Sequence, residues 1–128
     1  MKKKIIVTDK APKAIGAYSQ AVAVEKAILM FISGQLGFDP ATMELVSGGA
    51  AAEAAQALNN LKAIVAAAGG SMESIVKATI FLADIADFAA VNQVYAGFFA
   101  SDPPARAAFA VGALPKNARV EIEAVAAL

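Results

Sequence analysis

The chain has 128 residues, of which 59% are hydrophobic and 17% are charged, and its net charge is zero. This length predicts a single domain over residues 1–128, and the surplus of apolar residues predicts a surface that binds further copies of the chain. Zero net charge argues against nucleic-acid binding, which depends on a basic excess that neutralises phosphates.

The sequence contains no cysteine and no histidine. Disulfides, thiol nucleophiles and imidazole bases are therefore excluded, and a zinc site would need carboxylates alone. The longest run without a charge, residues 88–101, is too short for a membrane-spanning helix, which needs about 20 residues. The lysines at positions 2–4 precede only three apolar residues, which is too few for a signal peptide. We therefore expect a cytoplasmic protein without a membrane segment.

Three strands are predicted in the first quarter of the chain, over residues 5–7, 18–24 and 27–33. A tight turn at Glu25-Lys26 would join the second strand to the third. Glycines and a proline then predict a loop from Gly34 to Gly49.

Two helices and an intervening strand are predicted next. Alanine-rich residues 50–68 form the clearer helix, which Gly69-Gly70 would end. Alternating apolar residues predict a strand over 75–82. Asp87 is expected to cap the second helix, whose apolar face carries Phe88, Val91, Tyr95 and Phe98.

The last two strands are predicted over residues 105–113 and 118–127, joined by a turn at 114–117 as a closing hairpin. The order β-β-β-α-β-α-β-β predicts an α/β (α+β) domain whose mixed sheet carries both helices on one face. The other face would stay apolar and uncovered, which is typical of a dimer or trimer surface.

One arginine lies in a strand otherwise made of small residues. Arg106 shares a strand face with Ala108, Ala110 and Gly112. Small neighbours leave room above the sheet, where a guanidinium can bind a carboxylate through two parallel hydrogen bonds. A structural salt bridge or a solvated strand end would use the same residues, so both alternatives stay open here.

Glu121 lies on the last predicted strand, on the same face as Arg119 and Glu123. In the closing hairpin it would stand opposite Val111, about 17 Å from Arg106 at about 3.3 Å per residue. The two side chains could then meet only across a subunit interface. A half-exposed strand has the same pattern, so a solvated face is the alternative.

Three other residues could belong to a pocket. Gly34 could allow close approach of a ligand or could simply end a strand. Tyr18 could supply a phenol or pack as an ordinary strand aromatic, and Asn92 could face a pocket or form a hydrogen bond in the core. No phosphate-binding glycine loop is present, and a serine triad is impossible without histidine.

Five motifs occur in order along the chain: AIGAYSQ (14–20), ISGQ (32–35), FAAVN (88–92), PAR (104–106), and LPK with VEIEA (114–116, 120–124). Together they closely resemble the Rid/YjgF family, whose members are also labelled endoribonuclease L-PSP. The resemblance covers essentially the whole chain. It implies a chorismate-mutase-like fold that assembles as a homotrimer with three clefts between subunits.

The resemblance also implies an activity: enamine/imine deaminases of this family hydrolyse 2-aminoacrylate and related 2-imino acids to 2-keto acids and ammonia, without a cofactor or metal. By position, Arg106 would bind the substrate carboxylate and Glu121 would position or activate the attacking water. Tyr18, Ser33, Gly34 and Asn92 would shape the pocket. The backbone of Ala108 would contact the ligand, although many members have cysteine at that position.

Two other functions remain open from the sequence. Some family members are labelled ribonucleases or translation inhibitors, which the zero net charge and the lack of histidine oppose. A non-catalytic trimer that binds 2-keto acids would use the same cleft.

Overall fold

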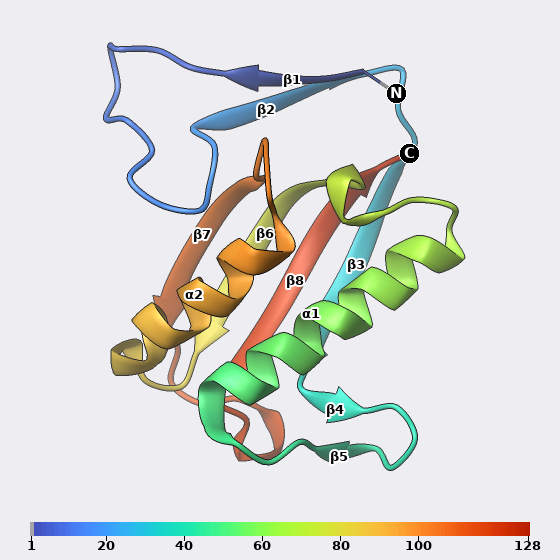
Figure 1. The fold of residues 1–128 in the computed structure, drawn as a ribbon, viewed down its shortest axis with the longest axis vertical. Coiled ribbons are helices and arrows are strands. Elements are labelled where there is room, and N and C mark those ends of the chain that lie inside the picture. Colours follow the sequence, from blue (N-terminus) through green and yellow to red (C-terminus); the bar gives the residue numbers. More distant parts are fainter. Residues whose placement is uncertain (1) are drawn as a thin grey trace.

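A four-stranded mixed sheet is the centre of the fold in the computed structural model, which describes residues 2–128 (Figure 1). Its strand order is β3-β8-β6-β7, with bounds Leu29–Leu36, Val120–Ala127, Ile75–Leu82 and Ala105–Ala110. β8 pairs antiparallel with both β3 and β6, whereas β7 is parallel to β6. The parallel pair needs a crossover, which helix α2 (Phe88–Phe98) provides.

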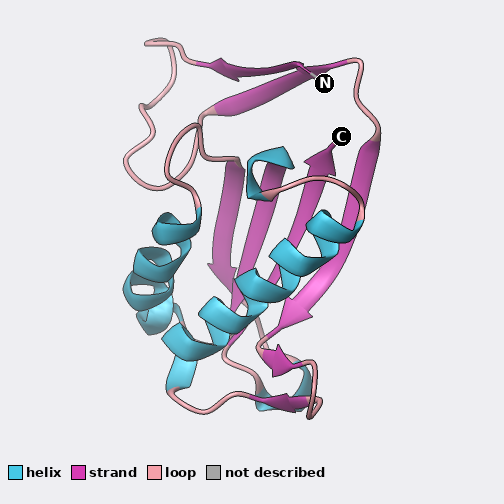
Figure 2. Ribbon diagram, turned by 45° about the vertical axis from the view of Figure 1, so that its right-hand side comes forward, coloured by secondary structure: helices cyan, strands magenta, loops and turns pink. Residues whose placement is uncertain are grey.

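Both helices cover the same face of this sheet (Figure 2). Helix α1 spans Gly49–Ala67 and buries Leu58, Leu61 and Val65 in one core with sheet residues such as Ile80 and Ile122. After α1 the chain passes through a left-handed glycine, Gly69. The predicted mixed sheet with two helices on one face is confirmed.

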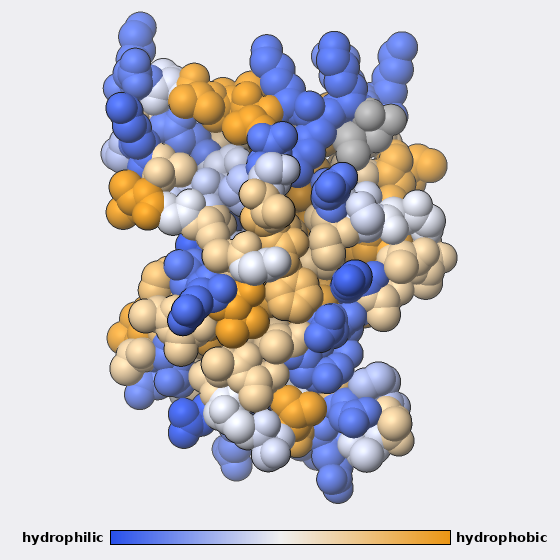
Figure 3. All heavy atoms as spheres, in the orientation of Figure 1, coloured by the Kyte–Doolittle hydropathy of each residue, from blue (hydrophilic) through white to orange (hydrophobic). Residues whose placement is uncertain are grey.

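The first two strands form a separate hairpin at one end of the sheet (Figure 1). β1 (Lys2–Ile6) pairs antiparallel with β2 (Ala21–Glu25), so the expected connection of β2 to β3 by a tight turn as neighbouring strands is wrong. Instead β3 takes β8 as its partner, and the pairing continues beyond the strands, where Ile28 and Leu128 exchange two backbone hydrogen bonds of 2.9 Å. Charged side chains project from the hairpin, while apolar side chains gather over the middle of the face seen in Figure 3.

Lys3 attaches this hairpin to the rest of the molecule. Its Nζ donates hydrogen bonds to the carbonyls of Glu73, at 3.3 Å, and Asp102, at 3.0 Å. Partial burial lowers the pKa of Lys3 below its ordinary value, although Asp102 and Glu73 oppose that shift.

The closing hairpin predicted for the last two strands is also wrong. Among residues 2–128, β7 pairs with β6 alone, and β8 lies on the other side of β6. The segment expected to be the hairpin turn contains a short 3-10 helix, η3 (Pro115–Asn117), that connects β7 to β8 across one intervening strand. The physical reason is burial: Val120, Ile122 and Ala126 of β8 are completely buried, and a central position covers them better than an edge position.

Three smaller expectations need correction. β3 continues to Leu36 through Ser33 and Gly34 rather than ending at Ser33. The predicted loop after it contains a second two-stranded sheet, β4 (Phe38–Asp39) with β5 (Glu44–Leu45). Asp87 precedes α2 but makes no capping hydrogen bond, and its carboxylate pairs with Arg119 at 3.7 Å.

The face of the sheet opposite the helices is uncovered and carries large apolar side chains. Phe31 is 77% exposed, Leu29 50% and Phe109 46%. Phe109 packs edge-to-face on Phe81 of the neighbouring strand. No helix within residues 2–128 is long and apolar enough to cross a membrane.

Candidate functional site

Arg106 is the centre of the first group of candidate site residues. It pairs with the core residue Ala78 across β7 and β6, so its side chain lies on the helix-covered side of the sheet. There Nη1 donates a hydrogen bond of 2.6 Å to Oδ1 of Asn92 on α2. The sequence-predicted residues Arg106 and Asn92 are therefore in direct contact, and Asn92 holds the guanidinium.

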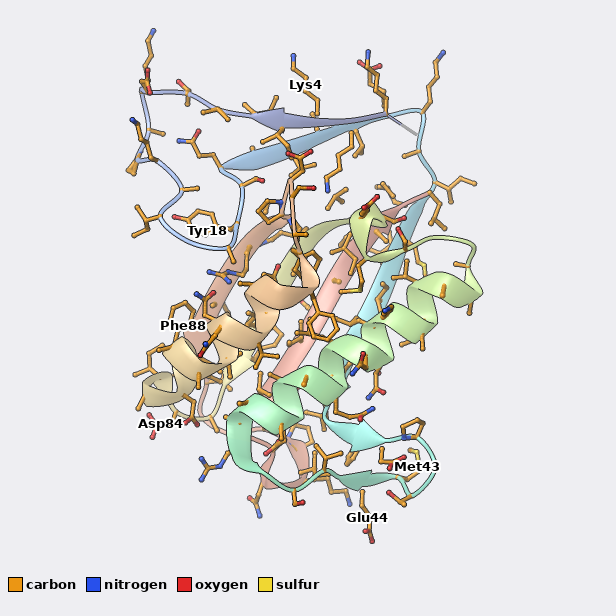
Figure 4. All side chains as sticks on the ribbon, viewed as in Figure 1. Lys4, Tyr18, Met43, Glu44, Asp84 and Phe88 are labelled. Carbon is orange, nitrogen blue, oxygen red and sulfur yellow. The ribbon has the colours of Figure 1, made fainter. Side chains whose placement is uncertain are left out.

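Three aromatic rings surround the guanidinium. Its Cζ lies 4.9 Å from the ring centre of Tyr95, 5.5 Å from Tyr18 and 5.7 Å from Phe88. In Figure 4, Tyr18 on the loop before β2 and Phe88 at the start of α2 lie on the same side of the molecule. Cations bind favourably over aromatic faces at such distances. Burial lowers the pKa of Arg106, but an arginine in a protein still stays charged.

Arg106 has no carboxylate partner within residues 2–128. In this part of the chain, the ion pair is formed by Arg119 and Asp87. The salt-bridge alternative for Arg106 is therefore not supported by the described part of the chain. A half-buried cation with free donors and no counter-ion is suited to binding an anion, because unpaired buried charge is costly.

The loop before β2 lies directly against this arginine. A Cβ added to Gly16 would be 3.7 Å from Nη2 of Arg106 and equally close to the Tyr18 ring. The backbone N–H of Ile15 donates to the Tyr18 hydroxyl at 3.3 Å. Ser19 attaches the loop to the start of β7, since its N–H donates to Pro104 O and its hydroxyl to Pro103 O. These contacts place Tyr18 beside Arg106.

Glu121 is the centre of a second group, on the uncovered face of the sheet. It pairs with Phe81 on β6, and its neighbour Ile122 points into the core. β3 bulges between Ile32 and Gln35 beside this residue. The Glu121 carboxyl group occupies the space where a side chain at Gly34 would begin, so any Cβ there would clash with it.

Ser33 belongs to this second group. It is exposed in the bulge next to Gly34, and its carbonyl accepts a hydrogen bond of 3.1 Å from the Gln35 side chain. Gly34 is therefore a strand residue that gives room to Glu121, and the alternative that it ends the strand is wrong.

The two groups lie on opposite faces of the sheet within one chain. Arg106 pairs with Ala78 on the covered side, whereas Glu121 pairs with Phe81 on the uncovered side. Ala108, opposite Ile80, is on the covered side with Arg106. Arg106 and Glu121 are therefore separated within one chain, as predicted, but for a different reason. Their strands are not hairpin partners, and the two side chains point to opposite faces of the sheet.

Sequence analysis missed the roles of Phe88 and Tyr95 around Arg106. Both belong to the apolar face predicted for α2, and that pattern is typical of core residues. Gly16 stood out only as a member of the AIGAYSQ motif. The spacing of Asn92 and Tyr95, three residues apart on one helix, was the available signal, because residues at that spacing lie on the same face.

Fold and site together define a small α+β domain with a half-buried arginine held by an asparagine among three aromatic rings. The family model described as Endoribonuclease L-PSP matches residues 8–128. The chain is 60% identical over 124 residues to a Bos taurus protein named 2-iminobutanoate/2-iminopropanoate deaminase, covering 97% of this chain and 89% of the relative. The chain therefore belongs to the Rid/YjgF family, also labelled endoribonuclease L-PSP.

Solved structures agree with this assignment. RidA from an Antarctic Psychrobacter has a TM-score of 0.76 and 50% identity, with 98% of this chain and 99% of that chain covered. E. coli TdcF with bound serine has a TM-score of 0.76 and 42% identity, with 98% of both chains covered.

Proposed function

We propose that this protein hydrolyses 2-aminoacrylate and related 2-imino acids to 2-keto acids and ammonia, in clefts between the subunits of a homotrimer. The observation that carries the proposal is Arg106, a half-buried cation held by Asn92 among three aromatic rings with no carboxylate partner in residues 2–128. The bovine relative's name supports the reaction class.

Arg106 would bind the substrate through its carboxylate. Nη1 is engaged by Asn92, which leaves the other guanidinium N–H groups for a planar anion. Two parallel charge-assisted hydrogen bonds fix orientation as well as affinity. Serine, the ligand in the solved TdcF structure, carries the same carboxylate next to a nitrogen-bearing carbon. Tyr18 contacts Arg106 on the covered side of the sheet, and Ala108 lies two residues along the same strand from Arg106. The Tyr18 ring and the backbone of Ala108 would complete the pocket wall.

Glu121 would act on the attacking water. The enamine first tautomerises to the imine, whose carbon is electrophilic. Water adds to that carbon as the carboxylate accepts one of its protons and passes it to nitrogen, which gives a carbinolamine. The hydroxyl proton of the carbinolamine is then transferred to nitrogen by the same carboxylate as the C–N bond breaks, so that ammonia leaves and the carbonyl forms. Binding in one orientation supplies the rest of the acceleration, so no cofactor is required.

The two groups would come from different subunits. Arg106, Tyr18, Asn92 and Ala108 lie on the covered side, and Ser33, Gly34 and Glu121 lie on the uncovered side. The exposed apolar residues of the uncovered face, such as Phe31 and Phe109, would be buried between subunits. A contact between unlike surfaces that closes on itself gives a ring, of which a trimer is one example.

A trimer that binds 2-keto acids without catalysis would use the same arginine, and turnover distinguishes it from a deaminase. The ribonuclease label gains no support from the site, since the cation at its centre is enclosed by rings rather than spread over a basic surface. Location in the cytoplasm stays a prediction.

The direct test is turnover of imines formed in situ. An amino-acid oxidase or a pyridoxal-phosphate dehydratase generates the imine, and semicarbazide, which traps the remaining imine, reports its decay. We expect the purified protein to accelerate release of 2-keto acid and ammonia in equal amounts. Binding of 2-keto acids with no acceleration for any imine tested would favour the non-catalytic alternative.

A further inference from the structure

Tyr95 lies against Arg106 as one of its three rings, and the function proposed above gives it no role of its own. It is completely buried, with 0% exposure, and it is the largest of the completely buried side chains. Its ring is the closest of the three to the guanidinium, at 4.9 Å. Its hydroxyl is the one buried side-chain polar atom in residues 2–128 that lacks a hydrogen-bond partner.

The three rings around Arg106 differ in how firmly they are held. Tyr18 belongs to a loop and Phe88 to the first residue of α2, and both are half-buried. Tyr95 is in the interior of α2, and Phe99 packs against it with ring centres 4.6 Å apart. Tyr95 is therefore the most firmly held ring beside the guanidinium of Arg106. Tyr18 and Phe88 contact the same guanidinium from more exposed positions.

Asn92 and Tyr95 act on the guanidinium from one turn of the same helix. Asn92 accepts from Nη1 at 2.6 Å, which fixes one edge of the planar group, and Tyr95 offers an aromatic face. An edge contact alone leaves the plane free to rotate about that edge, and a fixed ring beneath the guanidinium restricts this rotation. The direction of the remaining N–H donors then follows from the position of α2.

We propose that Tyr95 is a positioning residue that sets the plane of Arg106 through its ring, so that the free N–H groups are aimed at the substrate carboxylate. This inference rests on the proposed function of Arg106 in carboxylate binding. The Tyr95 hydroxyl has no hydrogen-bond partner within the described residues, and removing its oxygen leaves the ring in place. Burial raises the pKa of Tyr95, although the charge of Arg106 opposes that shift.

The proposal predicts a difference between two substitutions. Tyr95→Met keeps an apolar side chain but has no aromatic face, so we expect the affinity for a 2-keto acid product such as pyruvate to fall about tenfold, within the range of a desolvated cation–π contact. Tyr95→Phe keeps the ring, and we expect affinity within about twofold of the parent, with a higher melting temperature because an unpaired buried hydroxyl is lost.

The measurement is competitive inhibition by pyruvate and by pyruvamide, which lacks the carboxylate. Positioning of Arg106 predicts that Tyr95→Met weakens inhibition by pyruvate about tenfold and leaves inhibition by pyruvamide within about twofold. If Tyr95 were merely structural, Tyr95→Met would weaken inhibition by pyruvate and by pyruvamide equally, or would weaken neither. Val65→Ala, a core change on the other helix, is the control for lost stability alone.

Two outcomes separate this inference from the proposed function. If Arg106→Met loses pyruvate inhibition while Tyr95→Met keeps it, Tyr95 is not a positioning residue and the carboxylate role of Arg106 stands. If Arg106→Met also keeps inhibition and turnover, the carboxylate role itself is wrong. Should Tyr95→Met not fold, Tyr95→Leu gives the same comparison with a more rigid side chain.

Discussion

Replacing Arg106 by methionine is expected to lower kcat/KM for 2-imino acids by about a thousandfold. The substitution removes two charge-assisted hydrogen bonds to the substrate carboxylate, each worth about 1.5–3 kcal/mol, and about 1.4 kcal/mol corresponds to a tenfold change in rate. Methionine is apolar, so it can still pack among Tyr18, Phe88 and Tyr95. The loss is therefore expected without unfolding, which circular dichroism and thermal melting would check.

The other arginine of the sequence supplies a matched control. Arg119 is exposed and pairs with Asp87, the residue before Phe88, whereas the Arg106 guanidinium is held by Asn92. Arg119→Met removes the same charge and leaves the Arg106 group intact, so its kinetics should equal those of the parent. Equal losses in the two variants would mean that general charge, rather than the position of Arg106, governs activity.

Glu121→Gln is expected to lower kcat by about 10²- to 10⁴-fold, the range for loss of a general base, with KM nearly unchanged. Glutamine has the same shape, so it fits over Gly34 as the glutamate does, but it cannot accept the proton of water. Because the substrate carboxylate is assigned to Arg106, binding should survive. Steady-state kinetics with imines generated in situ separate the two parameters.

Glu123→Gln is the control for this change. Glu123 is exposed on the same strand and the same face, two residues further along. Its backbone lies opposite Thr79 on one side and the β3 bulge on the other, but the atoms nearest to a Cβ at Gly34 all belong to Glu121 and not to Glu123. We expect parent kinetics for this variant. A rise in KM with unchanged kcat in Glu121→Gln would instead assign Glu121 to substrate binding.

The helices and the strand between them could be predicted because their signals are local. The alternation in residues 75–82 matches β6, and the alanine-rich segment that stops before Gly69 matches α1 within one residue at each end. Strand pairing could not be predicted in the same way. A short connection such as 114–117 favours a hairpin locally. However, β8 forms more backbone hydrogen bonds by pairing with both β3 and β6, and this depends on strands that lie far away in the sequence.

Some residues of the candidate site could be predicted from the sequence, and others could not. Arg106 and Glu121 stood out as charges in apolar strands, and Asn92 as a polar residue beside an apolar helix face. Phe88 and Tyr95 did not, because an aromatic residue that packs on a cation and one that packs in a core have the same helical spacing. The assignment of the two charges to opposite faces required the register of β6 with both neighbours.

The central claim is that each site takes Arg106 from one subunit and Glu121 from another. Its most direct test mixes the two inactive variants, Arg106→Met and Glu121→Gln, by co-expression in equal amounts. With random assembly, each site has a functional arginine in about half of cases and a functional glutamate in about half, so about a quarter of parent activity should return. Activity no higher than the mean of the two separate variants, in mixed oligomers confirmed by native mass spectrometry, would contradict the claim.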